Sequence, residues 1–187
     1  GREDGGPWTS ASNTIRSVGI DTGSTVHDGS STLMVIGDAP RACVDAAWGV
    51  ATEASWPVIA EPQSRSVGRG VACGSLVAGS NAWVSRHAPE RVLVVGRPTL
   101  SRQIARLVSG AVAPVDVVTA GAGWPDAAHA ARRVYTAFDL RPGTAPSAAS
   151  PALLTAWAEA GRQAHLAVDR VLDESLADGR PPSGIAA

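Results

Sequence analysis

Residues 91–108, RVLVVGRPTLSRQIARLV, decide the fold class of this 187-residue chain. The run of Val and Leu at the start is typical of a buried parallel strand, and the Gly-Arg-Pro that follows it indicates a tight turn. From Leu100 to Val108 the apolar residues recur at helical spacing, which predicts an amphipathic helix. A strand that leads through a turn into a helix is the repeating unit of a parallel α/β sheet.

Units of the same kind recur along the chain. We predict strands at Thr32–Gly37, Pro57–Ala60, Val92–Val95, Val115–Thr119 and Val134–Phe138. We predict helices at Asp38–Ser55 (Asp38 near the N-cap, Pro40 in the first turn), weakly at 75–85, at Leu100–Val108 and at Pro151–Leu176, with a loop at Gln63–Gly74. The fold class that follows is α/β. We expect one Rossmann-like, doubly wound domain whose mostly parallel sheet has about five to six strands and helices on both faces.

Composition narrows the kind of partner. All 16 basic residues are arginines, against 17 acidic residues, and the net charge is -1. Scattered charges near neutrality disfavour nucleic acid and an anionic membrane surface as main partners. No apolar run approaches the roughly 18 residues of a membrane span, and no signal-peptide pattern is present, so we expect a cytoplasmic protein. Cys43 and Cys73 lack CxxC spacing and are predicted to be reduced, buried apolar residues.

The turn after Val95 carries the best candidate ligand-binding residues. In open α/β sheets, ligands lie outside the carboxyl ends of the strands, and Arg97 and Arg102 suit an anionic group there. The turns at Gly37 and Gly96 lack the GxGxxG pattern that brings a backbone close to a pyrophosphate, so dinucleotide binding is disfavoured. Glu61 occupies the place of a ribose-binding acid, but without that pattern a role in ordering a loop is the better interpretation.

Three segments in order resemble one enzyme family: Trp56–Pro62 (WPVIAEP), Gly96–Arg102 (GRPTLSR) and Gly123–Asp126 (GWPD). Together they are similar to the central domain of the menaquinone-pathway synthases of the MenD type, in their actinobacterial form. The resemblance covers nearly the whole chain. It implies an oligomeric thiamine diphosphate-dependent transferase that decarboxylates 2-oxoglutarate and adds the four-carbon unit to isochorismate.

The resemblance also implies a division into segments. Residues 1–30 are expected to form an interdomain arm, 31–146 the Rossmann-like core, 147–180 a C-terminal helix with an exit linker, and 181–187 the start of a third domain. The first and third domains would be partners within the same longer chain. In this family they hold thiamine diphosphate and Mg²⁺ or Mn²⁺ through an activating Glu and a Gly-Asp-Gly…Asn motif. Neither that motif nor a matching pair of metal ligands occurs here, so we expect this chain alone to hold no cofactor and to be inactive.

The family likeness suggests roles for the two arginines. It implies that Arg102 contacts a substrate carboxylate near a helix N-terminus; a solvated or ion-paired surface arginine is the alternative. Arg97, with Gly121, Gly123 and Asp126, is a candidate site for a regulatory anion such as the pathway product 1,4-dihydroxy-2-naphthoate. Relatives can carry an arginine where this chain has Gly123, which weakens that hypothesis. An ion pair between Arg97 and Asp126 is the alternative.

The remaining motifs favour structural roles. Trp56 and Trp124 each precede a proline and are predicted to be packing anchors, and the Arg132-Arg133 pair a solvated strand edge. The four histidines lack metal-ligand spacing, and Ser75 lacks the GxSxG context of a nucleophile. A stand-alone small-molecule or nucleotide-binding module remains the alternative function.

Overall fold

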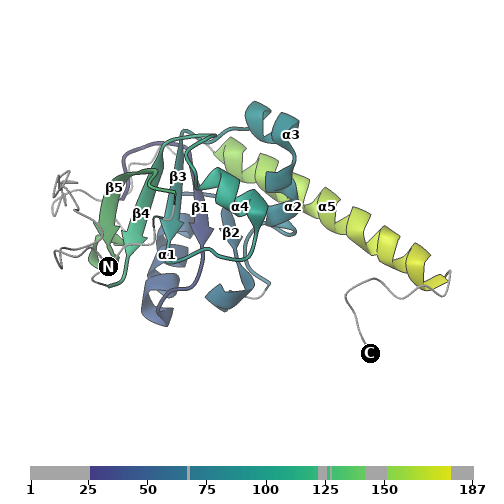
Figure 1. The fold of residues 1–187 in the computed structure, drawn as a ribbon, viewed down its shortest axis with the longest axis horizontal. Coiled ribbons are helices and arrows are strands. Elements are labelled where there is room, and N and C mark those ends of the chain that lie inside the picture. Colours follow the sequence, from purple (N-terminus) through teal and green to yellow (C-terminus); the bar gives the residue numbers. More distant parts are fainter. Residues whose placement is uncertain (1–25, 67, 122–125, 127, 142–150, 178–187) are drawn as a thin grey trace, which may run out of the picture.

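The computed structural model describes residues 26–66, 68–121, 126, 128–141 and 151–177 (Figure 1). Within them, five parallel strands form one sheet in the order β2-β1-β3-β4-β5. The strands are β1 (Thr32–Ile36), β2 (Val58–Ala60), β3 (Arg91–Val95), β4 (Val115–Thr119) and β5 (Ala131–Thr136). The predicted single α/β domain with a parallel, Rossmann-like sheet is confirmed.

Helices cover both faces of this sheet. They are α1 (Arg41–Glu53), α2 (Gly74–Gly79), α3 (Asn81–Arg86), α4 (Arg102–Leu107) and α5 (Pro151–Ala177), with short 3-10 turns at Pro62–Ser64 and Ala137–Asp139. One apolar cluster joins α1 to the face that carries Met34, Leu93 and Val118. A second joins the other four helices to the face that carries Leu33 and Val94. Successive side chains of a strand point to opposite faces, which is why the central strands carry apolar residues on both faces.

Among the described residues, helix α5 packs on the rest of the domain through its first half. Trp157 is fully buried, donates its indole N–H to the carbonyl of His87 at 3.3 Å, and meets the ring of Trp83 edge-on at 5.0 Å. A Cβ on Gly161 would lie 2.6 Å from the carbonyl oxygen of Ala72, so glycine permits this close approach. Further along, the helix projects past the sheet, as Figure 1 shows, and Leu166, Val171 and Leu176 are exposed there.

Several predicted boundaries need correction. Helix α1 has Pro40 at its N-cap position and no side-chain cap, because Asp38 pairs instead with the backbone of Arg97. The fifth strand runs Ala131–Thr136 rather than Val134–Phe138, since its exposed arginines hide the strand pattern. The weak helical segment is two helices, α2 and α3, separated by Ser80.

The amino-terminal edge of the sheet holds a buried ionic cluster around Arg91. Its guanidinium is fully buried and donates to the hydroxyl of Thr32 and, at 2.7 Å, to the carbonyl of Val26. Its Nη1 faces the carboxylates of Asp28 at 3.1 Å and Asp116 at 3.6 Å, at ion-pair distance but without hydrogen-bond alignment. Asp116 is also fully buried. The cluster fixes the segment that enters β1.

The Arg132-Arg133 pair lies exposed on the edge strand β5, as predicted, and its guanidinium groups also reach this cluster. Arg132 lies 3.4 Å from Asp116, and Arg133 lies 3.3 Å from Asp28, although both arginines remain about half exposed. A register shift beside Asp116 places Asp116 opposite Arg133 and makes Arg132 the extra residue of a bulge.

Asp28 is held in its ionised form by this environment. Burial opposes its ionisation, but hydrogen bonds from Ser30 and the charge of Arg91 hold its pKa below the ordinary value.

Candidate functional site

The turns that follow β1 and β3 are joined to each other at the carboxyl edge of the sheet. The amide of Asp38 donates to the carbonyl of Arg97 at 3.0 Å, and the amide of Arg97 returns a bond to the carbonyl of Asp38 at 2.8 Å. A Cβ on Gly37 would lie 2.2 Å from the backbone of Arg97, and one on Gly96 2.3 Å from the carbonyl of Asp38. Glycine is therefore required at both turns for this approach, and Gly96 also adopts a φ of +70°.

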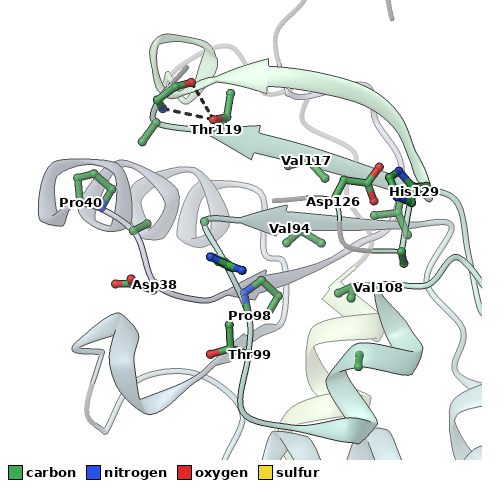
Figure 2. Close-up of a pocket in the computed structure, with 18 residues that line it drawn as sticks. Asp38, Pro40, Val94, Pro98, Thr99, Val108, Val117, Thr119, Asp126 and His129 are labelled. Atoms are coloured by element: carbon green, nitrogen blue, oxygen red, sulfur yellow. Dashed lines mark hydrogen bonds between the residues drawn. The ribbon is translucent and has the colours of Figure 1, made fainter. Parts of the chain in front are cut away.

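A cavity of about 960 Å³ opens beside this bridge and extends over β3 and β4 (Figure 2). Val94, Val115 and Val117 form its apolar floor, on the face of the sheet that α4 covers further along. Figure 2 shows Asp126 and His129 at one end and Asp38 and Pro40 at the other. In a regular doubly wound sheet the crossover from β4 to β5 would carry a helix over such a floor. The described residues between these two strands form none.

Arg97 contributes a cation to this cavity. The residue is exposed, and among the described residues its guanidinium has no ion-pair or hydrogen-bond partner. Asp126, also on the wall, accepts the backbone amides of Ala130 at 2.9 Å and Ala131 at 3.1 Å and so shapes the turn into β5. The alternative ion pair between Arg97 and Asp126 is thus not formed. The free cation beside an apolar floor suits a ligand with a flat apolar body and an acidic group.

The structure places Arg102 apart from the cavity. It is the first residue of α4, is exposed, and does not line the cavity with Arg97. The helix is only six residues long, and its N-terminus is already capped by the hydroxyl of Ser101, which accepts the amide of Ile104 at 3.3 Å. The expected support from a helix N-terminus is therefore slight.

Two of the other residues predicted for the effector site line the cavity, and the third is not described by the structure. Gly121 and Asp126 line the cavity with Arg97, whereas Gly123 lies outside the described residues. His129 also lines the cavity, in a left-handed conformation with φ of 51°, and was missed because a lone histidine carries no sequence signal.

Glu61 occupies the backbone groups that a bound anion would use in many sheets of this kind. Its carboxylate accepts the amides of Thr99 at 2.7 Å, Leu100 at 3.1 Å and Ser101 at 3.3 Å. The predicted loop-ordering role for Glu61 is confirmed by these three bonds.

The tryptophan prediction is confirmed for Trp56, which is buried and lies 5.1 Å from the ring of His27, while Trp124 falls outside the described residues. Both cysteines are free; Cys43 is buried and Cys73 is half-buried. No group of three acidic, Cys or His side chains suitable for a metal is found in the described part of the chain. No helix of that part is both long and apolar enough to cross a membrane.

Comparison with known proteins finds similarity to one group of synthases. The chain is 37% identical over 149 residues to the 2-succinyl-5-enolpyruvyl-6-hydroxy-3-cyclohexene-1-carboxylate synthase of Kineococcus radiotolerans, covering 78% of this chain and 26% of that protein. It is 32% identical over 181 residues to the synthase of the same name from Saccharopolyspora erythraea, covering 92% of this chain and 30% of the relative. The chain is thus similar to one region of these synthases.

A third synthase of that name, from Rhodococcus erythropolis, is 27% identical over 126 residues and matches 67% of this chain and 20% of its own length. The chain therefore spans 20–30% of the length of the relatives that it matches. No protein-family model matches the sequence.

Proposed function

We propose that this chain is the central domain of a menaquinone-pathway synthase and that it serves mainly as a scaffold with an anion-binding surface. The match to one region of three synthases carries the proposal. The complete, cytoplasmic and oligomeric enzyme would decarboxylate 2-oxoglutarate and add the succinyl-semialdehyde unit to isochorismate. Its first and third domains, joined to residues 1–30 and 181–187, would supply the catalytic groups.

The described residues do not fit thiamine diphosphate and its metal ion. They include no cluster of metal-ligating side chains, and the one deeply buried glutamate at the carboxyl edge, Glu61, is fully engaged with backbone amides. In this proposal the cofactor and its Mg²⁺ or Mn²⁺ belong to the other domains. The 187-residue chain alone is then expected to form no product from 2-oxoglutarate and isochorismate, and product formation by the purified chain would refute this division of labour.

Arg102 is proposed to contact a substrate carboxylate in the complete synthase. Its guanidinium is exposed and without a partner among the described residues, so it is available to a group on a neighbouring domain. We expect Arg102→Ala to raise KM for one of the two acidic substrates about tenfold, with little change in kcat, because one charge-assisted contact is lost from ground and transition states alike. Arg41→Ala, which removes an exposed arginine on α1, is the matched control. Unchanged kinetics in the Arg102 variant would refute the role.

The cavity beside Arg97 is proposed as a regulatory site for an aromatic carboxylate. Support comes from the valine floor, the unpaired guanidinium and the volume, which suits a two-ring ligand. Calorimetric titration with 1,4-dihydroxy-2-naphthoate tests this, with heat expected for the wild-type chain and for Arg41→Ala. Loss of that heat in Arg97→Ala supports the site, and absence of heat in the wild type refutes it.

The same cavity keeps the second candidate function open, a stand-alone module that binds a small molecule. That function is favoured if the chain binds an aromatic carboxylate and the coding region on either side of it encodes no catalytic domain.

A further inference from the structure

Glu61 is a buried carboxylate that is held by backbone amides rather than by a cation of the described residues. It follows β2 directly, is 5% exposed, and makes no ion pair with any described residue. A buried charge of this kind is costly unless hydrogen bonds satisfy it. The chain meets that demand with the amides of Thr99, Leu100 and Ser101, which converge on the two carboxylate oxygens.

A second element reinforces the same contact. The side-chain amide of Gln63, in the 3-10 turn after β2, donates to the carboxylate of Glu61 and lies 3.3 Å from the hydroxyl of Thr99. The loop after β3 is thus held by residues that lie close to 40 positions earlier in the chain.

The held loop lies between the two arginines of the proposed function. Its first residue, Arg97, is fixed through the backbone bridge to Asp38, and its end is fixed by the Ser101 cap on α4. Between those points the backbone of Thr99 to Ser101 has no bond to a strand and depends on Glu61 alone for its three amides.

We infer that Glu61 is a positioning residue: it fixes the loop that links Arg97, beside the cavity, to Arg102, apart from it, and so sets the place from which each guanidinium meets an anionic group. By accepting the loop amides itself, Glu61 also removes them as donors, so an acidic ligand must be recognised by the guanidinium groups. The ligand part of this inference rests on the proposed function, whereas the positioning part concerns the loop alone.

Amide exchange of Thr99, Leu100 and Ser101, followed by NMR in the 187-residue chain, tests the positioning part. We expect Glu61→Ala to speed exchange of these three amides about tenfold or more, because each loses a charge-assisted acceptor. Added sodium acetate should slow the exchange again in Glu61→Ala and leave the wild type unchanged. Glu90→Gln is the matched control, since Glu90 also accepts a backbone amide, that of Ser31 at 2.7 Å, but at the opposite edge of the sheet.

Calorimetry with 1,4-dihydroxy-2-naphthoate tests the ligand part on the same variants. Affinity should fall about tenfold in Glu61→Ala and Glu61→Gln but not in Glu90→Gln. If the wild type gives no heat, the proposed ligand is refuted, and the amide exchange of Thr99, Leu100 and Ser101 alone tests the positioning role of Glu61. Equal affinity of the wild type and the Glu61 variants would overturn the inference. If Glu61→Ala does not fold, Glu61→Gln tests the inference instead, because its side-chain NH₂ replaces one of the two acceptor oxygens. Unchanged amide exchange of Thr99, Leu100 and Ser101 in Glu61→Gln would also overturn the inference.

Discussion

Removal of the buried guanidinium of Arg91 is expected to destabilise the domain strongly. Arg91→Met keeps much of the side-chain volume but leaves the fully buried Asp116, among the described residues, with the half-exposed Arg132 at 3.4 Å as its remaining ion-pair partner. The substitution also removes the donor to the carbonyl of Val26. Breaking a buried ion pair from one side costs about 3–5 kcal/mol, which in a chain of this length corresponds to a fall in Tm of roughly 6–20 °C.

Urea unfolding followed by circular dichroism measures this cost directly. Arg41→Ala is the control, because Arg41 pairs with Asp45 in an exposed i,i+4 contact on α1 that contributes at most about 0.5 kcal/mol. The double variant of Arg91→Met with Asp116→Asn should be less destabilised than the sum of the single variants by about 1–3 kcal/mol, since the uncompensated charge is gone. A cost for Arg91→Met below about 1 kcal/mol, or strict additivity, would refute the view that this cluster is tightly coupled.

Three further perturbations have defined outcomes. Trp157→Ala should cost about 3–5 kcal/mol in urea unfolding and release α5 to proteolysis, and a cost below about 1 kcal/mol would contradict its role as the anchor. Because the pKa of Asp28 is lowered in the folded state, its stabilising contribution is present above the unfolded pKa and is lost as pH falls through the folded pKa. Asp28→Asn should therefore reduce the loss of unfolding free energy on acidification, and an unchanged pH dependence would argue against this role of Asp28. Gly96→Ala should lower Tm far more than Gly29→Ala. Both glycines have a positive φ, but of these two positions an added Cβ would meet backbone atoms at Gly96 and nothing at Gly29. Equal falls in Tm would show that the strain of a positive φ alone accounts for the effect.

The central sheet was predictable because its strands are buried on both faces. Continuous runs of Val, Leu and Ile leave no alternation, and the glycines that follow β1 and β3 mark the turns, so the ends of these strands agree with the prediction within one residue. The fifth strand was displaced because it forms the edge of the sheet and alternation is broken by the bulge at Arg132. An exposed edge strand with consecutive charges carries little periodic signal.

The buried cluster was missed although one signal pointed to it. Asp116 interrupts the apolar run of β4, and a carboxylate in a fully buried strand requires a cation or several donors. Only the parallel register, which brings Arg91 beside β4, shows where that cation comes from. At the other edge, Arg97 and Arg102 are five positions apart in the chain, yet only Arg97 lines the cavity, because the loop held by Glu61 separates them.

The contacts at the carboxyl edge also predict that adenine nucleotides do not bind this chain. In sheets of order 2-1-3-4-5, ligands bind beyond the ends of β1 and β3, where the strand order reverses. Here the bridge between Asp38 and Arg97 crosses that position, and a phosphate would have to displace the carboxylate of Glu61 from its amides. A ligand at a hundred times its Kd stabilises a protein by about 2.7 kcal/mol, roughly 5–11 °C in Tm for a chain of this size. Millimolar ADP is therefore expected to change Tm by less than about 1 °C. A rise of several degrees with ADP, but none with 1,4-dihydroxy-2-naphthoate, would refute this reasoning and favour a nucleotide-binding module, because the bridge and the carboxylate would then have to yield to phosphate.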